Sequence, residues 1–529
     1  MADTTQRHIA EDSAYTITCP YCFNRASGGN GEPIPHTKVL FRSGTYFSSP
    51  REIEQKLGYS ELDIEMMNSG DERTARKKTF DTYKSFLIRK DPVYQAFWDS
   101  FEGRTTEQPS RSGNVQNPWE LPIIGPNNGV TRLVPDMDGF VTQAVDVFGK
   151  TTHNRVCPFC HNPFPLGFGK NKVKYISIIG ITGSGKTVYI SQLLKNMTDF
   201  ASKVGLNAYF TSDHETNFIE NNVVKKGMPL PDSTSPRRLS QPMFYDIVRS
   251  DGTVQKTDTI VLYDIAGENC RRAEDMEDFA QYVKHSDGLI LLIDPKQLGF
   301  LSADMDEDEI DEPSLALNTL WSVLENRTNR KCKIPVAVCV SKSDQCYGIL
   351  PPIAQETVHS TGLDQSGLPV MEFDGKTLNE LVMGDHGLKD LMLHNAQAVC
   401  QNLSTGYWNY NFFSVSATGC ACAATEEGFY APVNRPEPKR IEEPILWMFK
   451  QFGFIRSNER VRRPFKIKHA DRYIYRKKMF GKPYLEKQPD EFAEYEEERI
   501  RIAPQVLVKN EWMPMTDEYR NLPIVTKGE

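Results

Sequence analysis

The chain has 529 residues, which is too long for a single hydrophobic core and predicts roughly two to four domains. Hydrophobic residues make up 39% of it and charged residues 25%, so a largely disordered chain is excluded. Its net charge of −8 excludes the global basic signature of a nucleic-acid-binding protein. We see no secretory signal at the first residues and no apolar run longer than a strand, so we expect a cytoplasmic protein without a membrane partner.

Two C-x-x-C pairs stand far apart in the sequence, and their thiols belong to Cys19, Cys22, Cys157 and Cys160. Each pair forms a tight turn with two thiolates on one side, and two such turns supply the tetrahedral S₄ set that Zn²⁺ takes. Helix-like patterns within residues 51–106 predict a helical insertion between the pairs. We therefore expect residues 1–171 to form a zinc-ribbon-like region with one shared Zn²⁺. The alternatives are a redox C-x-x-C, or two sites completed by histidines such as His36 or His161.

Residues 177–192, SIIGITGSGKTVYISQ, carry the pattern G-x-x-x-x-G-K-[ST] between a β-branched run and an apolar helical period. Glycines let successive backbone N–H groups point inward at phosphate oxygens, and the N-terminus of the following helix adds to the attraction. We expect Lys186 to bridge the β- and γ-phosphates and Thr187 to offer its hydroxyl to Mg²⁺. The predicted phosphate-binding residues are Gly180, Gly183, Ser184, Gly185, Lys186 and Thr187.

Residues 243–268 contain two β-rich runs around a Ser-Asp-Gly turn, which predicts an antiparallel hairpin whose second strand ends at Asp264. A carboxylate at that place can hold a water of the octahedral Mg²⁺ shell. The next residues complete a D-x-x-G, in which Gly267 lets a backbone N–H approach the γ-phosphate. Many P-loop ATPases carry a glutamate where this chain has Ile265, so this segment is not typical of those ATPases.

Two later strands end in segments that suit a guanine base. The first, KIPVAVCVSKSD, ends in Ser341, Lys342, Ser343 and Asp344, and the ends of parallel strands are where open α/β sheets bind ligands. A carboxylate there accepts hydrogen bonds from N1–H and the 2-amino group of guanine, which adenine does not offer. The second, NFFSVSATG, places Ser416 and Ala417 after a strand, where a backbone N–H would reach the guanine O6.

In this order, G-x-x-x-x-G-K-T, D-x-x-G, S-K-x-D and S-A-T resemble the TRAFAC class of P-loop GTPases, and within it the bacterial double-GTPase-type proteins of conflict and defence systems. The resemblance covers roughly residues 172–455. It implies an α/β fold with a mixed, mostly parallel sheet and helices on both faces. The base motif of the family reads N-K-x-D or T-K-x-D, so Ser341 is a departure, whereas Lys342 and Asp344 are retained.

The resemblance also implies two catalytic roles. A threonine between the P-loop helix and the hairpin closes over the nucleotide and joins Mg²⁺, and Thr234 in LPDSTSPRR is the candidate. Glu268 stands where Ras-like enzymes carry the glutamine that orients the attacking water. Arg271 and Arg272 would either stabilise charge in the transition state or form surface ion pairs.

Insertions are expected near residues 300–315 and 345–387, the first containing DMDEDEIDE, which suggests a solvated loop. Residues 456–529 are expected to form a C-terminal extension. The stretch 455–484, which overlaps the first part of this extension, contains eleven Lys or Arg residues, two acids and interleaved aromatic residues. This pattern is typical of grooves that bind single-stranded nucleic acid. Seven acids within residues 486–498 offer an alternative, in which they neutralise the basic stretch.

The sequence therefore predicts a Mg²⁺-dependent GTP-binding molecular switch with slow or partner-stimulated GTP hydrolysis. The resemblance implies that it acts as a regulatory component of a bacterial conflict or defence system. We expect it to bind GTP, GDP, Mg²⁺ and Zn²⁺ and to control a protein effector. Two alternatives remain: a nucleotide-bound scaffold or nucleic-acid adaptor that does not hydrolyse, and a P-loop ATPase.

Overall fold

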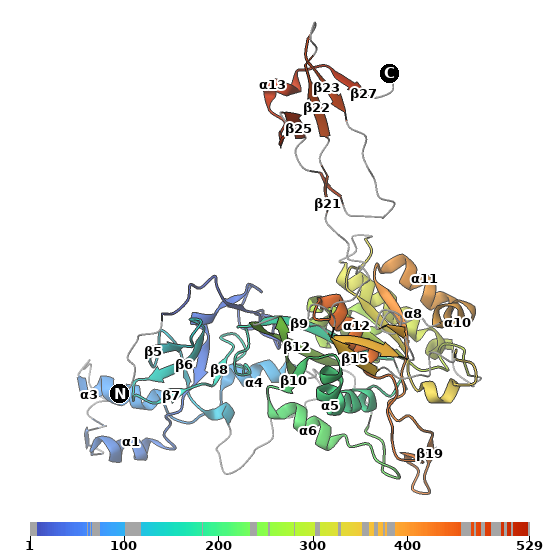
Figure 1. Cartoon of the computed structure of the whole chain (residues 1–529). Helices are drawn as coiled ribbons and strands as arrows, with labels where there is room; N and C mark the ends of the chain where they lie inside the picture. The colour runs from blue at the N-terminus through green and yellow to red at the C-terminus, as the bar shows by residue number, and fades with distance from the viewer. Residues whose placement is uncertain are drawn as a thin grey trace. The chain divides into compact units, whose positions relative to one another are not determined.

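We describe the fold from a computed structural model of the whole chain (Figure 1). The chain divides into two compact units, Met1–Arg460 and Val461–Glu529. The structure describes residues 8–60, 62–63, 65, 75–100, 118–181, 183–232, 241–251, 254–279, 281–301, 307–325, 330–351, 359–363, 369–373, 376–377, 387–455, 467–469, 472–477, 482–487, 499–501, 505–508 and 511–526. No helix within these ranges has the length and apolar character needed to cross a membrane.

A seven-stranded sheet forms the centre of the first unit, in the order β10-β11-β12-β9-β13-β14-β18 (Figure 1). From β12 to β18 the strands run parallel, while β10 and β11 add an antiparallel edge. The predicted mixed, mostly parallel sheet is confirmed, and so is the hairpin, which is β11–β12. The bounds are β9 Lys172–Gly180, β10 Asn207–Phe210, β11 Met243–Asp251, β12 Val254–Ala266, β13 Gly288–Ile293, β14 Val336–Val340 and β18 Tyr410–Ser414.

Helices cover both faces of this sheet. All six residues of β13, GLILLI, are buried, as expected for a parallel strand covered on both sides. One face packs against α5 (Lys186–Lys203) and α12 (Glu443–Phe452), with α6 (Asp213–Asn221) beside α5. The other face packs against a second set, namely α7 (Ala273–Phe279), α8 (Glu307–Leu324), α10 (Leu388–Asn395) and α11 (Gln397–Gly406).

The acidic run at residues 304–312 is partly helical, so the expectation of a loop there was wrong for residues 307–312, which begin α8. Carboxylates near a helix N-terminus interact favourably with the partial positive charge of that end, so an acidic run can start a helix. Glu312 also has a structural role, because its buried carboxylate is ion-paired with Arg271 at 3.3 Å. Residues 302–306 lie outside the described part of the chain.

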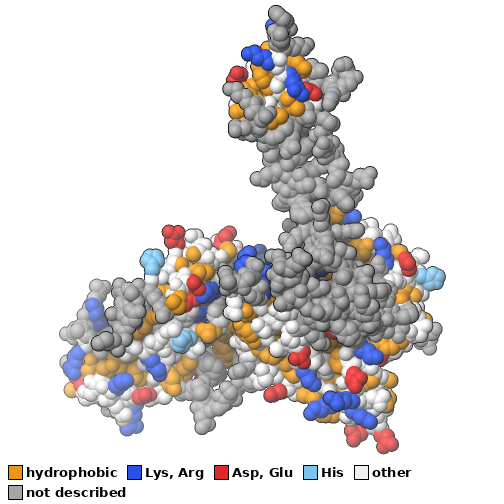
Figure 2. All heavy atoms as spheres, in the orientation of Figure 1, with side chains coloured by type: hydrophobic (Ala, Val, Ile, Leu, Met, Phe, Trp, Pro, Cys, Tyr) orange, Lys and Arg blue, Asp and Glu red, His pale blue; other side chains and the backbone are white. Residues whose placement is uncertain are grey.

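The second insertion contains three short strands, β15 (His359–Leu363), β16 (Pro369–Phe373) and β17 (Lys376–Thr377), which form their own sheet. Figure 2 shows Lys and Arg side chains interspersed with Asp and Glu over the described surface of the first unit. On that face the charges are therefore mixed, in keeping with the modest net charge.

The second unit contains a five-stranded sheet in the order β26-β25-β22-β23-β27. Its small core includes Leu485 and Val506. Within the basic and aromatic stretch, Arg476 is ion-paired with Glu486 at 2.7 Å, so one of the acids predicted to neutralise this stretch does contact it. The elements are β21 (Ile467–His469), β22 (Arg472–Arg476), β23 (Tyr484–Lys487), β24 (Arg499–Arg501), β25 (Gln505–Val508), β26 (Glu511–Pro514), α13 (Asp517–Arg520) and β27 (Ile524–Thr526).

The N-terminal region of the first unit combines short strands with the predicted helical insertion. The helices are α1 (Pro50–Leu57), α3 (Ala75–Ser85) and α4 (Pro92–Asp99). The small sheets were not predicted, since strands of two to six residues give little periodic signal. They are built from β1 (Thr16–Ile17), β2 (Ile34–Pro35), β3 (Leu40–Arg42), β4 (Ile123–Ile124), β5 (Val130–Pro135), β6 (Val141–Asp146), β7 (Thr151–Thr152) and β8 (Arg155–Val156).

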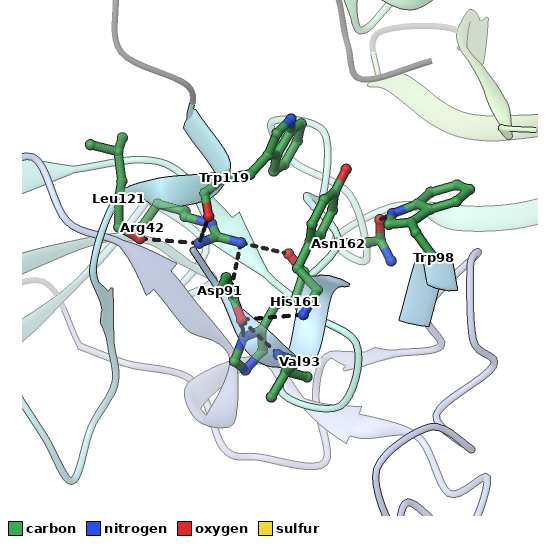
Figure 3. Close-up of polar contacts among 9 residues, drawn as sticks. Arg42, Asp91, Val93, Trp98, Trp119, Leu121, His161 and Asn162 are labelled. Atoms are coloured by element: carbon green, nitrogen blue, oxygen red, sulfur yellow. Dashed lines mark hydrogen bonds and ion pairs between the residues drawn. The ribbon is translucent and has the colours of Figure 1, made fainter. Parts of the chain in front are cut away.

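A buried polar network ties this insertion to the second C-x-x-C turn (Figure 3). Asp91 caps α4 by accepting from the N–H of Val93 at 3.0 Å, and Figure 3 shows Arg42 and His161 converging on the same carboxylate. The Arg42 Nη2 atom lies 2.7 Å from Asp91 Oδ2, and His161 Nδ1 lies 2.9 Å from it. Since His161 directly follows Cys160, Asp91 joins the helical insertion to the turn that carries two thiols.

Aromatic side chains join the N-terminal region to the central sheet. The rings of Phe23 and His285 stack at 4.1 Å between centroids, and His285 ends the short helix η4 (Gln281–His285). The Tyr263 hydroxyl of β12 donates to the carbonyl of Pro20 at 2.8 Å. The two parts therefore share one core and lie in one unit.

The Asp91 network predicts a stability change that can be measured. Asp91→Ala leaves the buried Arg42 guanidinium without its carboxylate, so we expect the N-terminal region to lose about 3 to 5 kcal/mol. The control is Asp63→Ala, because Asp63 pairs with Arg76 on the surface at 3.3 Å and its loss should leave α4 unchanged. Hydrogen exchange of the α4 amides measures both variants, and parent-like protection in Asp91→Ala would contradict the role of the pair.

The same pair has a defined pH dependence. Burial acts to raise the pKa of Asp91, but the contacts with His161 and Arg42 outweigh it and hold the pKa below its ordinary value. A lowered carboxyl pKa contributes stability above the unfolded-state value of about 3.9, and this is lost as the pH falls through the folded-state pKa. The difference between the parent and Asp91→Ala should therefore shrink in acid.

Candidate functional site

The P-loop connects the end of β9 to the start of α5. Gly183 and Gly185 have φ angles of 76° and 74°, in the left-handed region where glycine costs least. A Cβ atom on Gly180 would lie 2.4 Å from the Cβ atom of Lys186, so a side chain at this position does not fit. The loop thus has the close, glycine-dependent turn that the sequence pattern predicts, with Ser184 buried within it.

The D-x-x-G segment lies directly against the P-loop. β12 runs parallel to β9 with Ala266 opposite Gly180, and a Cβ atom on Gly267 would lie 2.4 Å from the carbonyl oxygen of Gly180. Asp264 is buried at this end of β12 and is ion-paired with Lys186. Thr187, the other predicted Mg²⁺ ligand, directly follows Lys186 and is also buried. The structure therefore brings the predicted phosphate and Mg²⁺ residues together.

Glu268 lies partly exposed in the turn η3 (Gly267–Cys270) that follows. Burial raises the pKa of the neighbouring Cys270 thiol to about 12, the charge of Glu268 adds to this, and the charge of Lys186 opposes it. The charges of Glu268 and Lys186 therefore both influence the Cys270 thiol. Arg271 is ion-paired with Glu312, whose carboxylate is buried, so the pair is not the surface pair that was considered as the alternative. Thr234 lies outside the described residues.

A pocket of about 330 Å³ joins the P-loop to the predicted base-binding segments. Of the predicted residues, five line it: Ser184, Gly185, Lys342, Asp344 and Ala417. Sequence reasoning missed further residues of the lining, above all Leu230, Lys296, Cys422 and Tyr430. The first two give no motif signal, and the last two belong to a hairpin that is inserted after the S-A-T segment.

Lys342 has a left-handed backbone conformation, with φ of 46°, and its side chain lies close to the P-loop. Its ammonium group is 2.9 Å from a carboxylate oxygen of Asp294, and a Cβ atom on Gly185 would lie 3.6 Å from its Cε atom. Asp294 directly follows β13 and was not predicted as a site residue. The signal was available, because an aspartate at the end of a buried parallel strand is also what marks Asp264.

Ser416 holds Asp344 through its side chain. The Ser416 hydroxyl donates to Asp344 Oδ1, while the Ser416 N–H donates to the carbonyl of Lys439 at 2.9 Å. The expectation that Ser416 offers its N–H to a base therefore needs correction, and Ala417 is the member of the predicted pair that lines the pocket. Ser341, the departure from the family motif, donates its hydroxyl to the carbonyl of Ile293 at 2.9 Å and so fastens this segment to β13.

The four cysteines of the C-x-x-C pairs form one buried cluster, with all Sγ atoms within 4.8 Å of one another. The Sγ atoms of Cys19 and Cys160 are 3.6 Å apart, and those of Cys22 and Cys157 are 3.7 Å apart. A tetrahedral Zn–S₄ centre with bonds of about 2.3 Å places its sulfurs about 3.8 Å apart, so this cluster can hold a zinc ion.

The two histidines considered as extra ligands have other contacts. His36 Nδ1 accepts from the N–H of Val141 at 3.0 Å, and His161 Nδ1 contacts Asp91. Asn24, which was not predicted, supports the first turn, because its buried side chain accepts from the N–H of Cys19 at 3.0 Å. These contacts favour one shared site over two separate ones.

Residues 174–394 match the family Double-GTPase 2. A relative from Mycolicibacterium smegmatis, described as "Putative ESX-1 scaffolding and assembly protein SaeC", is 23% identical over 328 residues, which is 57% of this chain and 80% of that protein.

Among solved structures, the chain is similar to sup35 complexed with GDP, at 11% identity and a TM-score of 0.19, over 47% of this chain and 38% of that one. It is also similar to the GTPase-like domain of S. cerevisiae Ski7 bound to GTP, at 10% identity and a TM-score of 0.23. The same domain bound to GDP and inorganic phosphate gives 11% and 0.24. Both Ski7 matches cover 54% of this chain and 51% of the other. The chain therefore spans about half of the Ski7 chains and 38% of the sup35 chain, and TM-scores this low do not establish a shared arrangement.

The ordered motifs, the edge of the sheet at which they meet and the family match agree with one another. Residues 174–394 of this chain are therefore similar to the P-loop GTPases of the double-GTPase type.

Proposed function

We propose that this protein is a Mg²⁺-dependent GTP-binding switch with slow intrinsic hydrolysis, which controls the assembly of a protein complex. The observation that carries the proposal is the pocket that joins Gly185 of the P-loop to Asp344 and Ala417. One end of this pocket suits phosphates and the other suits a guanine base. The residues at both ends follow strands of the same sheet.

At the phosphate end, Lys186 would turn from Asp264 to the β- and γ-phosphates of the nucleotide. Asp264 would then lose its ion pair with Lys186 while remaining buried, which is unfavourable unless another cation takes the place of the lysine. Mg²⁺ fits this place, because a carboxylate and the Thr187 hydroxyl are the hard oxygen ligands that it prefers. The ion would neutralise phosphate charge, Thr187 and Asp264 would hold the ion, and Lys186 would bind the β- and γ-phosphates.

At the base end, Asp344 would accept hydrogen bonds from the guanine edge. The Ser416 hydroxyl already orients this carboxylate, so the group is positioned before the nucleotide binds. Ala417 would supply the N–H for the guanine O6. The role of Ser341 in fastening the segment explains how the base motif is held without the asparagine or threonine of other family members.

Glu268 and Thr234 are the proposed catalytic residues beside Lys186. Glu268 would orient or deprotonate the attacking water, although its charge also repels the γ-phosphate and so limits the rate. Arg271 is ion-paired with Glu312, which argues against its acting on the phosphates without a rearrangement. We therefore assign slow turnover to the isolated protein, stimulated when a partner supplies a further positive charge.

The effector is proposed to be a protein complex under assembly. The relative from Mycolicibacterium smegmatis is described as a scaffolding and assembly protein, which favours an assembly role over the defence role implied by the resemblance. The same description supports a second candidate, in which the chain is a nucleotide-bound scaffold that does not hydrolyse GTP. The C-terminal basic stretch leaves nucleic acid as a weaker alternative partner.

One experiment separates these functions. Nucleotide released from denatured, purified protein is identified by mass spectrometry, and GDP formation from added GTP is then followed. Guanine nucleotide with GDP formation supports the switch, and guanine nucleotide without turnover supports the scaffold. Adenine nucleotide in its place would overturn the guanine assignment.

Asp344→Asn tests the base contact. This change removes two charge-assisted hydrogen bonds to guanine, so we expect GTP binding to weaken by about 2 to 4 kcal/mol. Binding of xanthosine triphosphate should improve, because its 2-oxo group needs a donor opposite it. Calorimetry with GTP and with xanthosine triphosphate measures this change in base preference. Equal binding of ATP and GTP by the parent protein would contradict the guanine assignment.

Glu268→Ala tests turnover. We expect GTP affinity within a few fold of the parent and single-turnover hydrolysis slower by roughly 10²-fold or more, as for the loss of a general base. Lys186→Ala is the comparison that loses both binding and hydrolysis, and so does not separate a switch from a scaffold. A parent-like rate in Glu268→Ala would show that Glu268 is not catalytic and would leave Thr234 and a partner arginine as the candidates.

Cys157→Ser tests the proposed zinc site. Structural zinc contributes directly to folding, so this variant should lose its metal and its order in the N-terminal region while nucleotide binding is largely retained. Cys420→Ser is the control, because Cys420 lies outside the cluster and should leave one zinc per chain. Elemental analysis that finds no metal, or two zinc ions, in the parent protein would contradict the shared site.

A further inference from the structure

A two-stranded hairpin stands between the S-A-T segment and α12. It consists of β19 (Cys422–Ala424) and β20 (Tyr430–Pro432), which pair with each other and not with the central sheet. The hairpin projects from the body of the first unit (Figure 1). Its base is fastened beside the S-A-T segment, where the N–H of Glu437 donates to the carbonyl of Thr418 at 2.8 Å.

The hairpin contributes to the same pocket as the base-binding segment. Cys422 and Tyr430 line this pocket together with Asp344 and Ala417. Tyr430 is 63% exposed, although a large aromatic ring gains free energy when it is covered. A tyrosine ring at the edge of a half-open pocket therefore has apolar surface available to a ligand.

The hairpin is also bonded to the segment that follows α6. The N–H of Gly227 donates to the carbonyl of Pro432 at 3.0 Å, and the N–H of Leu230 donates to the carbonyl of Tyr430 at 2.9 Å. Leu230 lines the pocket as well. Tyr430 and Leu230 thus come from two segments, about 200 residues apart in the sequence, that meet at one wall.

We propose that the β19–β20 hairpin forms the outer wall of the base subsite, with Tyr430 covering the base and ribose end of a bound guanine nucleotide. This inference rests on the proposed function of the pocket. Asp344 and Ala417 present polar groups to the edge of a purine, but its faces are flat and apolar and need a different partner. Tyr430 and Leu230 are apolar members of the lining that are not buried, unlike Val188, Tyr189 and Val415, so their surface is available to a ligand.

The wall has a consequence for the segment that precedes Thr234. The N–H groups of Gly227 and Leu230 donate to carbonyls of the strand that carries Tyr430, so a nucleotide that contacts Tyr430 is linked to residues 227–230 through these two hydrogen bonds.

Tyr430→Ala and Tyr430→Phe test the contact. If the ring covers the nucleotide, Tyr430→Ala weakens GDP binding by about tenfold or more, and Tyr430→Phe stays within about twofold of the parent. Tyr209→Ala is the matched control, because Tyr209 is 48% exposed on β10 at the far edge of the sheet and should have no effect. Calorimetry with GDP measures all four proteins, and parent-like affinity in Tyr430→Ala overturns the inference.

A second measurement uses the unaltered protein. Of its eleven cysteines, nine are buried and two, Cys420 and Cys422, are partly exposed. Only Cys422 of these two lines the pocket, so GDP should slow alkylation of Cys422 by about fivefold or more and leave Cys420 within about twofold. Mass spectrometry of the peptide that contains both thiols reads the two rates, and equal protection of both or of neither overturns the inference.

The two measurements also separate this inference from the function on which it rests. If the parent protein binds no guanine nucleotide, both the proposed function and this wall are wrong. A different outcome is that the parent protein binds GDP through Asp344, Tyr430→Ala keeps the parent affinity and GDP leaves the rate of Cys422 alkylation unchanged. In that case the proposed function stands and only the hairpin wall is wrong.

Discussion

The site depends on one constraint, the parallel alignment of the strands from β12 to β18. Parallel strands end at the same edge of a sheet, so the residues that follow them are brought together however far apart they lie in the sequence. The register shows this directly, since Gly180 lies opposite Ala266 and Leu292, while Val340 lies opposite Ile293 and Ser414. The proposed contacts to phosphate, metal ion and base lie at this edge, on the strand ends and on the segments that follow them.

Charges of opposite sign meet at that edge and determine what can bind there. Lys186 is paired with Asp264 and Lys342 with Asp294, and both aspartates are buried. Separating a buried carboxylate from a cation paired with it is costly, so a nucleotide that draws Lys186 to its phosphates is expected to bring another cation with it. This explains why the proposed function couples nucleotide binding to Mg²⁺.

The sequence predicted those parts of the site that depend on local spacing. The P-loop, the D-x-x-G and the strand ends before Lys342 and Ser416 are short patterns whose geometry follows from neighbouring residues. It did not predict the pairing of Lys342 with Asp294, or the hairpin that brings Tyr430 to the pocket, because both depend on contacts between distant segments. It misjudged the acidic residues 307–312 for a related reason, since a charge run without apolar periodicity looks like a loop until a buried partner is seen.

The N-terminal region meets the nucleotide domain along the strand that carries Asp264. Side chains alternate across a strand, and Tyr263, the residue before Asp264, donates to Pro20 within the first C-x-x-C turn. The position of Asp264 does not depend on this contact alone, because β12 is hydrogen-bonded along its length to β9 on one side and to β11 on the other. The helix η4 has no such support from the sheet ladder, and it meets the cysteine turn through the stacked rings of Phe23 and His285. If the cysteine cluster became disordered, we therefore expect η4 to lose its position before β12, the strand that carries Asp264, does.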